Sequence, residues 1–73
     1  MKKKNFVIYH ADPEMMIGRV ITEATELSGK VQKPVIAYVR GIAVRVNKDT
    51  SLETGIAQYL RNLELYIRVR VRD

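Results

Sequence analysis

The chain has 73 residues, no cysteine and a formal net charge of +5, which predicts one small domain without disulfide bonds or thiolate metal sites. A core of this size gives marginal stability, so pairing of two copies would help by burying more apolar surface. The positive charge favours an acidic partner, either nucleic acid or an acidic protein. We find no stretch apolar enough for a membrane span or a signal peptide, and the lack of cysteine fits the cytoplasm. We therefore expect a cytoplasmic protein that spans no membrane.

The first predicted element is a strand at residues 6–9, Phe-Val-Ile-Tyr. Such a run of β-branched and aromatic residues is typical of a strand. Its residues are apolar at odd and even positions alike, so the sequence leaves open which pair faces the core.

A helix over residues 13–28 is predicted next. Asp12 suits the capping position, Pro13 the first helical position and Glu14 the positive end of the helix. Gly29 suits a helix end. Apolar residues recur between these points with helical spacing, which predicts a buried face. They are Met16, Ile17, Val20, Ile21, Ala24 and Leu27.

Residues 35–46 are predicted to form a β-hairpin that turns at Arg40-Gly41. The apolar residues are odd-numbered before this dipeptide and even-numbered after it. A two-residue loop would pair residue 39 with 42, 37 with 44 and 35 with 46, which places all these apolar side chains on one face. The opposite face would carry Ile36, Tyr38, Ala43 and Arg45. A single long strand with a bulge at the glycine is the alternative.

A second helix is predicted to open at residues 50–53, where Thr50 and Glu53 match a capping box. Gly55 inside it costs about 1 kcal/mol relative to alanine; it either permits close packing or is merely tolerated. The apolar stripe of this helix is Leu52, Ile56, Tyr59, Leu60 and Leu63.

The last predicted element is a strand over residues 65–72, where aliphatic residues alternate strictly with arginines and one tyrosine. Side chains alternate between the faces of a strand, so this segment predicts an aliphatic row on one face and a cationic row on the other. The complete order, β-α-β-β-α-β, is that of a ferredoxin-like α+β domain spanning residues 1–73. Two helices would cover one face of a four-stranded antiparallel sheet with strand order 4-1-3-2, and the last strand would lie at an edge.

The open face of this predicted sheet is the candidate binding surface. Aromatic rings stack on bases and guanidinium groups pair with phosphates, so the leading hypothesis is a non-enzymatic module that binds DNA or RNA. Its contact residues would be Tyr38, Arg40, Arg45, Tyr66, Arg68, Arg70 and Arg72. We expect no enzyme activity, metal or cofactor, because His10 is the only histidine and no ligand or nucleophile cluster has suitable spacing.

Three alternatives remain for the arginine row of the last strand. The row would also suit a small regulator or inhibitor that binds an acidic protein. The last strand could instead pair with its copy across a two-fold axis and form a homodimer with a continuous sheet. Finally, the charges could serve only to protect an exposed sheet edge from unwanted pairing.

Overall fold

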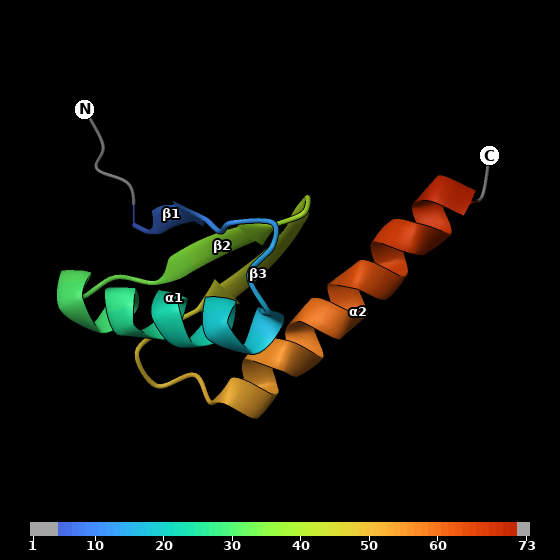
Figure 1. Ribbon diagram of the computed structural model, residues 1–73. Coiled ribbons are helices and arrows are strands. Elements are labelled where there is room, and N and C mark those ends of the chain that lie inside the picture. Colours follow the sequence, from blue (N-terminus) through green and yellow to red (C-terminus); the bar gives the residue numbers. More distant parts are fainter. Residues whose placement is uncertain (1–4, 72–73) are drawn as a thin grey trace.

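The computed structural model describes the backbone of residues 5–71 and the side chains as far as residue 69. The elements are β1 (Val7–His10), α1 (Ile17–Val31), β2 (Val35–Val39), β3 (Ile42–Val46) and α2 (Leu52–Val71). The strands form one sheet in the order β1-β2-β3, in which β1 is parallel to β2 and β2 antiparallel to β3. Helix α1 covers one face of the sheet, and α2 runs beside β3 and continues past it (Figure 1).

The prediction of a ferredoxin-like fold is wrong. Residues 65–71, expected as a fourth strand, are the end of α2, so the described sheet is three-stranded and mixed instead of four-stranded and antiparallel. The order 4-1-3-2 also fails, because β1 lies next to β2. No glycine or proline follows Gly55, so nothing stops the helix before the alternating segment. The α+β composition, with two helices and a sheet, is confirmed.

The predicted hairpin is confirmed with its register. Val39 pairs with Ile42, and the pairing continues from there to Val35 and Val46. Arg40 and Gly41 both have positive φ angles, of 50° and 83°. Positive φ at both loop positions is characteristic of a type I′ turn, whose twist matches that of the flanking strands. The alternative of one long bulged strand is therefore excluded.

Helix α1 begins and ends later than predicted. The Asp12 carboxylate accepts a hydrogen bond from the Glu14 N–H at 2.9 Å, and its carbonyl accepts one from the Met15 N–H. These bonds close a turn before the helix. At the other end the helix passes Gly29, and Gln32 adopts the left-handed cap with φ 59°. The Gln32 side-chain amide supports this cap by donating to the Gly29 carbonyl at 2.9 Å.

Helix α2 begins one residue later than the predicted capping box implies. The Ser51 hydroxyl caps it by accepting the Thr54 N–H at 3.1 Å, whereas the Thr50 hydroxyl accepts the Asn47 N–H. Of the two interpretations of Gly55, close packing is correct. A Cβ atom on Gly55 would lie 2.5 Å from Cγ2 of Ile21, so this glycine brings α2 directly against α1.

The core lies between α1 and the sheet, with Tyr59 of α2 closing one side. Val7 and Tyr9 pack against this core. The odd-numbered residues of β1 are therefore the ones that point towards the core. Met16, predicted to be buried, is 79% exposed because it precedes the helix. The buried apolar residues are Val20, Ile21, Ala24, Val35, Ala37, Val39, Ile42, Val44, Val46 and Tyr59.

Candidate protein-interaction surface

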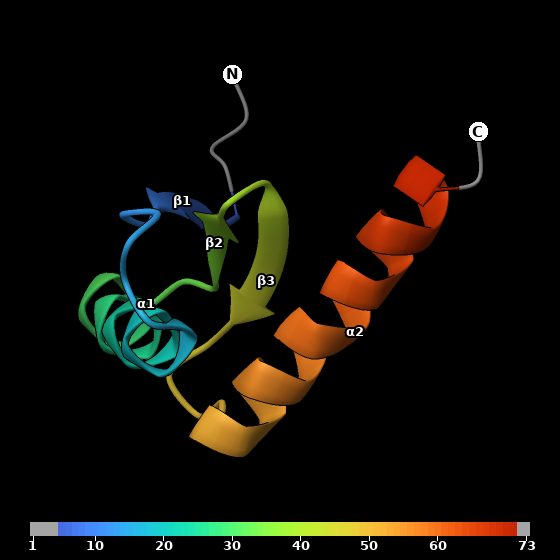
Figure 2. The ribbon, with the colours of Figure 1, turned by 45° about the vertical axis from the view of Figure 1, so that its right-hand side comes forward.

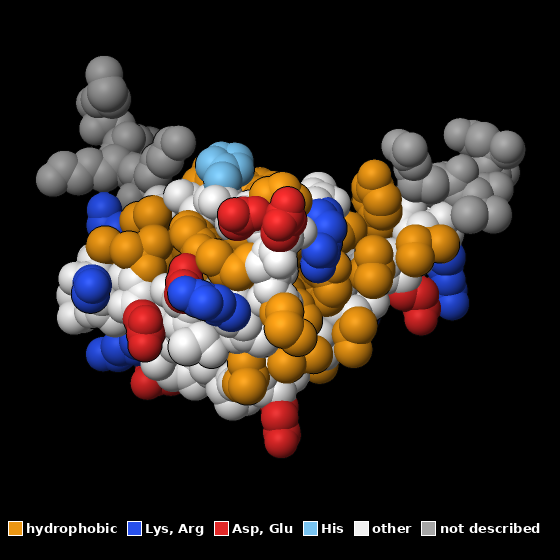
Figure 3. Space-filling model, in the orientation of Figure 1, with side chains coloured by type: hydrophobic (Ala, Val, Ile, Leu, Met, Phe, Trp, Pro, Cys, Tyr) orange, Lys and Arg blue, Asp and Glu red, His pale blue; other side chains and the backbone are white. Residues whose placement is uncertain are grey.

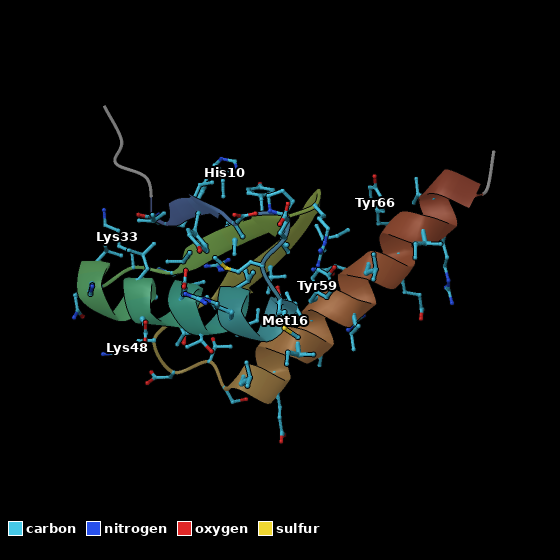
Figure 4. The ribbon with its side chains drawn as sticks, viewed as in Figure 1. His10, Met16, Lys33, Lys48, Tyr59 and Tyr66 are labelled. Atoms are coloured by element: carbon cyan, nitrogen blue, oxygen red, sulfur yellow. The ribbon has the colours of Figure 1, made fainter. Side chains whose placement is uncertain are left out.

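Two of the predicted binding residues share the face of the sheet that α1 leaves open. Tyr38 of β2 is 37% exposed, and Arg45 of β3 is also exposed. His10 stacks on Tyr38, with ring centroids 5.6 Å apart and an angle of 20° between the ring planes. Sequence reasoning missed His10 as part of this face, because the facing of β1 was ambiguous. Figure 4 shows His10 on the side of the sheet away from α1.

Arg40 lies at the rim, as predicted, in the hairpin turn. Its Nη1 donates a hydrogen bond to the Pro13 carbonyl at 2.8 Å. This bond ties the turn to the segment between β1 and α1, so Arg40 has a structural contact as well as an exposed position.

Among the described residues the predicted row is absent, because the segment that would carry it is the end of α2. A helix turns about 100° per residue, so positions two apart do not share a face. Tyr66 and Arg68 lie on α2, and the Arg68 guanidinium pairs with the Glu64 carboxylate at 3.2 Å. Arg70 belongs to α2, but its side chain lies outside the described atoms, and Arg72 lies outside the described residues. The proposed dimer through a C-terminal edge strand is also wrong, because residues 65–71 are helical.

The first half of α2 closes the free edge of β3 with side-chain amides. Gln58 accepts the Arg45 N–H at 2.7 Å and donates to the Arg45 carbonyl at 2.9 Å. Asn62 donates to the Ala43 carbonyl at 2.7 Å. Outward-pointing backbone groups of an edge strand otherwise invite another strand, so these amides take the place of a fourth strand.

Beyond Leu63, α2 leaves the sheet and presents an exposed apolar surface. Figure 2 shows this part of the helix diverging from β3, and in Figure 3 hydrophobic side chains follow it. We call it the outer apolar surface. Its members, which share one side of α2 by their helical spacing, are Leu65 (49% exposed), Tyr66 (42%) and Val69 (70%). Leu60 (56%) and Ile67 (50%) are also exposed, but their spacing places them on the opposite side of the helix.

A groove of about 330 Å³ lies between the hairpin turn and this part of α2. One wall comes from the turn and the start of β3, and the other from α2. Tyr66 stands on the α2 wall (Figure 4). None of the lining residues is charged; they are Gly41, Ile42, Ala43, Asn62, Leu65, Tyr66 and Val69.

Within residues 5–69, a polar cluster joins β1 to α1 on the covered face of the sheet. The Tyr9 hydroxyl donates to the Glu23 carboxylate at 2.8 Å, and the Arg19 Nε donates to it at 3.0 Å. The bond from Tyr9, followed by that from Arg19, lowers the pKa of Glu23. Burial, followed by the bond to Glu23, raises the pKa of Tyr9. The cluster satisfies its own charges and thereby fixes β1 against α1.

Among the described residues, His, Asp and Glu side chains form no group of three or more that could hold a metal ion. The helices described are also too short or too polar to cross a membrane. Comparisons with protein-family models, with curated proteins and with solved structures each give no match.

Proposed function

We propose that the chain is a non-enzymatic protein-interaction module that binds its partner through the outer half of α2. The observation that carries this proposal is the outer apolar surface, whose three side chains are 42–70% exposed on one side of a projecting helix and line the groove. Scattered exposed apolar residues are common, but contiguous apolar patches on a protein surface mark interaction sites. An apolar helix that enters a groove of its partner is a recurrent mode of protein recognition.

The charges of α2 favour a protein partner over a phosphate backbone. Arg68, one of the predicted phosphate contacts, already pairs with Glu64. The side of α2 that lines the groove carries Leu65 and Val69, which gain more from an apolar contact than from an anion.

The test is capture of a partner from nuclease-treated lysate by the immobilised chain. We expect the wild type to retain a protein that a double variant, Leu65→Glu with Val69→Glu, does not retain. Ala57→Glu is the control, because it places a glutamate on an exposed position of α2 outside the outer apolar surface. Equal capture by the double variant would contradict the proposal. Circular dichroism must show the same helix content in all three chains.

A second candidate function is binding of single-stranded nucleic acid on the open sheet face. The stacked pair of His10 and Tyr38 beside the exposed Arg45 supports it, since bases stack on such rings. Titration of labelled single- and double-stranded DNA and RNA at two salt concentrations tests it. Binding should weaken with salt and should be lost in a Tyr38→Ala, Arg45→Ala variant but kept in Arg68→Ala. No binding at low salt would remove this candidate.

A further inference from the structure

We infer that the partner of the outer apolar surface is a second copy of the same chain. This inference rests on the function proposed above. Two α2 helices would cross antiparallel near Leu65 and Tyr66, so that the outer half of each helix lies in the groove between the hairpin turn and α2 of the other copy.

The groove and the helix that would fill it are built from the same residues. Leu65, Tyr66 and Val69 line the groove and are also exposed on the outer half of α2. A two-fold axis through this region would bring each copy's groove against the other's helix in a single operation. Such self-complementarity is what an isologous interface requires.

The spacing along α2 suits an antiparallel helix pair. Asn62, Leu65, Tyr66 and Val69 follow an i, i+3, i+4, i+7 pattern, which forms one continuous ridge on a helix. Asn62 supplies the only amide side chain of this ridge, and that amide already donates to the Ala43 carbonyl. That bond lets the ridge be buried without leaving this amide donor unpaired.

Charge also permits two copies to approach. The groove lining contains no charged residue, so it offers nothing to a strongly acidic partner. Arg61, Glu64 and Arg68 share a different side of α2 by their helical spacing, and Glu64 partly neutralises Arg68 through their 3.2 Å contact. Burial of the ridge therefore leaves these charges in water.

The available area predicts a reversible dimer. The exposed parts of Leu65, Tyr66 and Val69 amount to well under the area of about 800 Å² per partner that a standard interface buries. The walls of the groove add to this area. An interface at the small end of the range dissociates on dilution, so we expect a monomer–dimer equilibrium that depends on protein concentration.

The first test is the molar mass of the full chain in solution, measured by sedimentation equilibrium over a wide range of concentration. The mass should rise from that of a monomer towards twice that value. Leu65→Lys combined with Val69→Lys should stay monomeric, whereas the control Ala57→Lys should dimerise like the wild type. A wild-type mass that stays monomeric, or a double variant that dimerises equally well, would overturn the inference.

The second test uses the absence of cysteine from the chain. A disulfide requires Cα atoms within about 7 Å, so a single cysteine near the two-fold axis should link two copies on mild oxidation. We expect Leu65→Cys to give a covalent dimer and Ala57→Cys to give little. Equal linking of both variants would contradict the antiparallel crossing.

The two proposals fail in different ways. If the chain is monomeric and unlinked, but partner capture still depends on Leu65 and Val69, the inference is wrong and the interaction function stands with another protein. If capture is also insensitive to these residues, both proposals are wrong.

Discussion

At the residue scale, Glu23 couples folding to pH through its bonds from Tyr9 and Arg19. Its pKa in the folded chain lies below the ordinary value of 4.5. A lowered carboxyl pKa means that the ionised form stabilises the fold. This contribution is complete above the ordinary pKa and is lost as the pH falls through the lower, folded value. The cluster therefore weakens only in acid.

The Tyr9→Phe variant tests this coupling, because it removes the largest cause of the shift. We expect the pKa of Glu23 to rise towards 4.5, so that ionisation of Glu23 stabilises the fold less at neutral pH. An NMR titration of the Glu23 carboxyl carbon measures the pKa, and urea midpoints at neutral and acidic pH measure the stability. Thr22→Val, an exposed change on α1, is the control. An unchanged Glu23 titration in Tyr9→Phe would refute the coupling.

At the scale of elements, Gln58 explains how a sheet with three described strands closes its edge without another strand. Its amide both donates to and accepts from the backbone of Arg45, as the backbone of a neighbouring strand would. A hydrogen bond contributes about 0.5–1.5 kcal/mol net. Gln58→Ala should therefore lower the free energy of unfolding by about 1–3 kcal/mol and speed hydrogen exchange at the Arg45 N–H.

The nearly isosteric Gln58→Glu is the matched control for this prediction. A carboxylate keeps the acceptor for the Arg45 N–H but loses the donor to the Arg45 carbonyl. Hydrogen exchange at the Arg45 N–H should therefore remain slower in Gln58→Glu than in Gln58→Ala. Urea denaturation and exchange monitored by NMR distinguish the variants. Identical Arg45 exchange in Gln58→Ala and the wild type would show that the amide does not seal the edge.

Elements whose signals are local could be predicted from the sequence. The hairpin follows from the change in apolar parity across Arg40-Gly41, and both its turn and its register are encoded within twelve residues. The hairpin register also determines that Tyr38 and Arg45 lie on the same face of the sheet. The segment at 65–71 could not be assigned from parity, because its alternating pattern also fits a helix with apolar residues on two flanks. The deciding signal is the missing stop after Gly55.

The outer apolar surface was missed for the same reason. As a strand, the segment would have buried Leu65, Ile67 and Val69 together on one face. As a helix, it exposes all of them and separates Arg68 from its expected neighbours. One error in local structure thus moved the candidate site from the cationic to the apolar residues of the segment.

At the scale of the whole molecule, the chain divides into a packed body and a projecting helix end (Figure 1). The body holds the buried core, against which α2 packs as far as Leu63. The outer apolar surface contributes little to that core. Its effect on stability should therefore come mainly through association, since a partner that binds only the folded state raises stability by mass action.

A comparison of two valines separates these contributions. Val44 is fully buried and Val69 is 70% exposed, so Val44→Ala removes core packing whereas Val69→Ala removes surface. Val44→Ala should lower the free energy of unfolding by about 1–3 kcal/mol at any protein concentration, because it leaves a cavity.

Val69→Ala should lower the free energy of unfolding by less than about 0.5 kcal/mol in dilute solution. At high protein concentration the loss caused by Val69→Ala should be larger, because the wild type gains stability from dimerisation and the variant gains less. Thermal unfolding at two protein concentrations measures both effects. A wild-type Tm that does not rise with concentration would mean that association adds nothing to the stability of the fold.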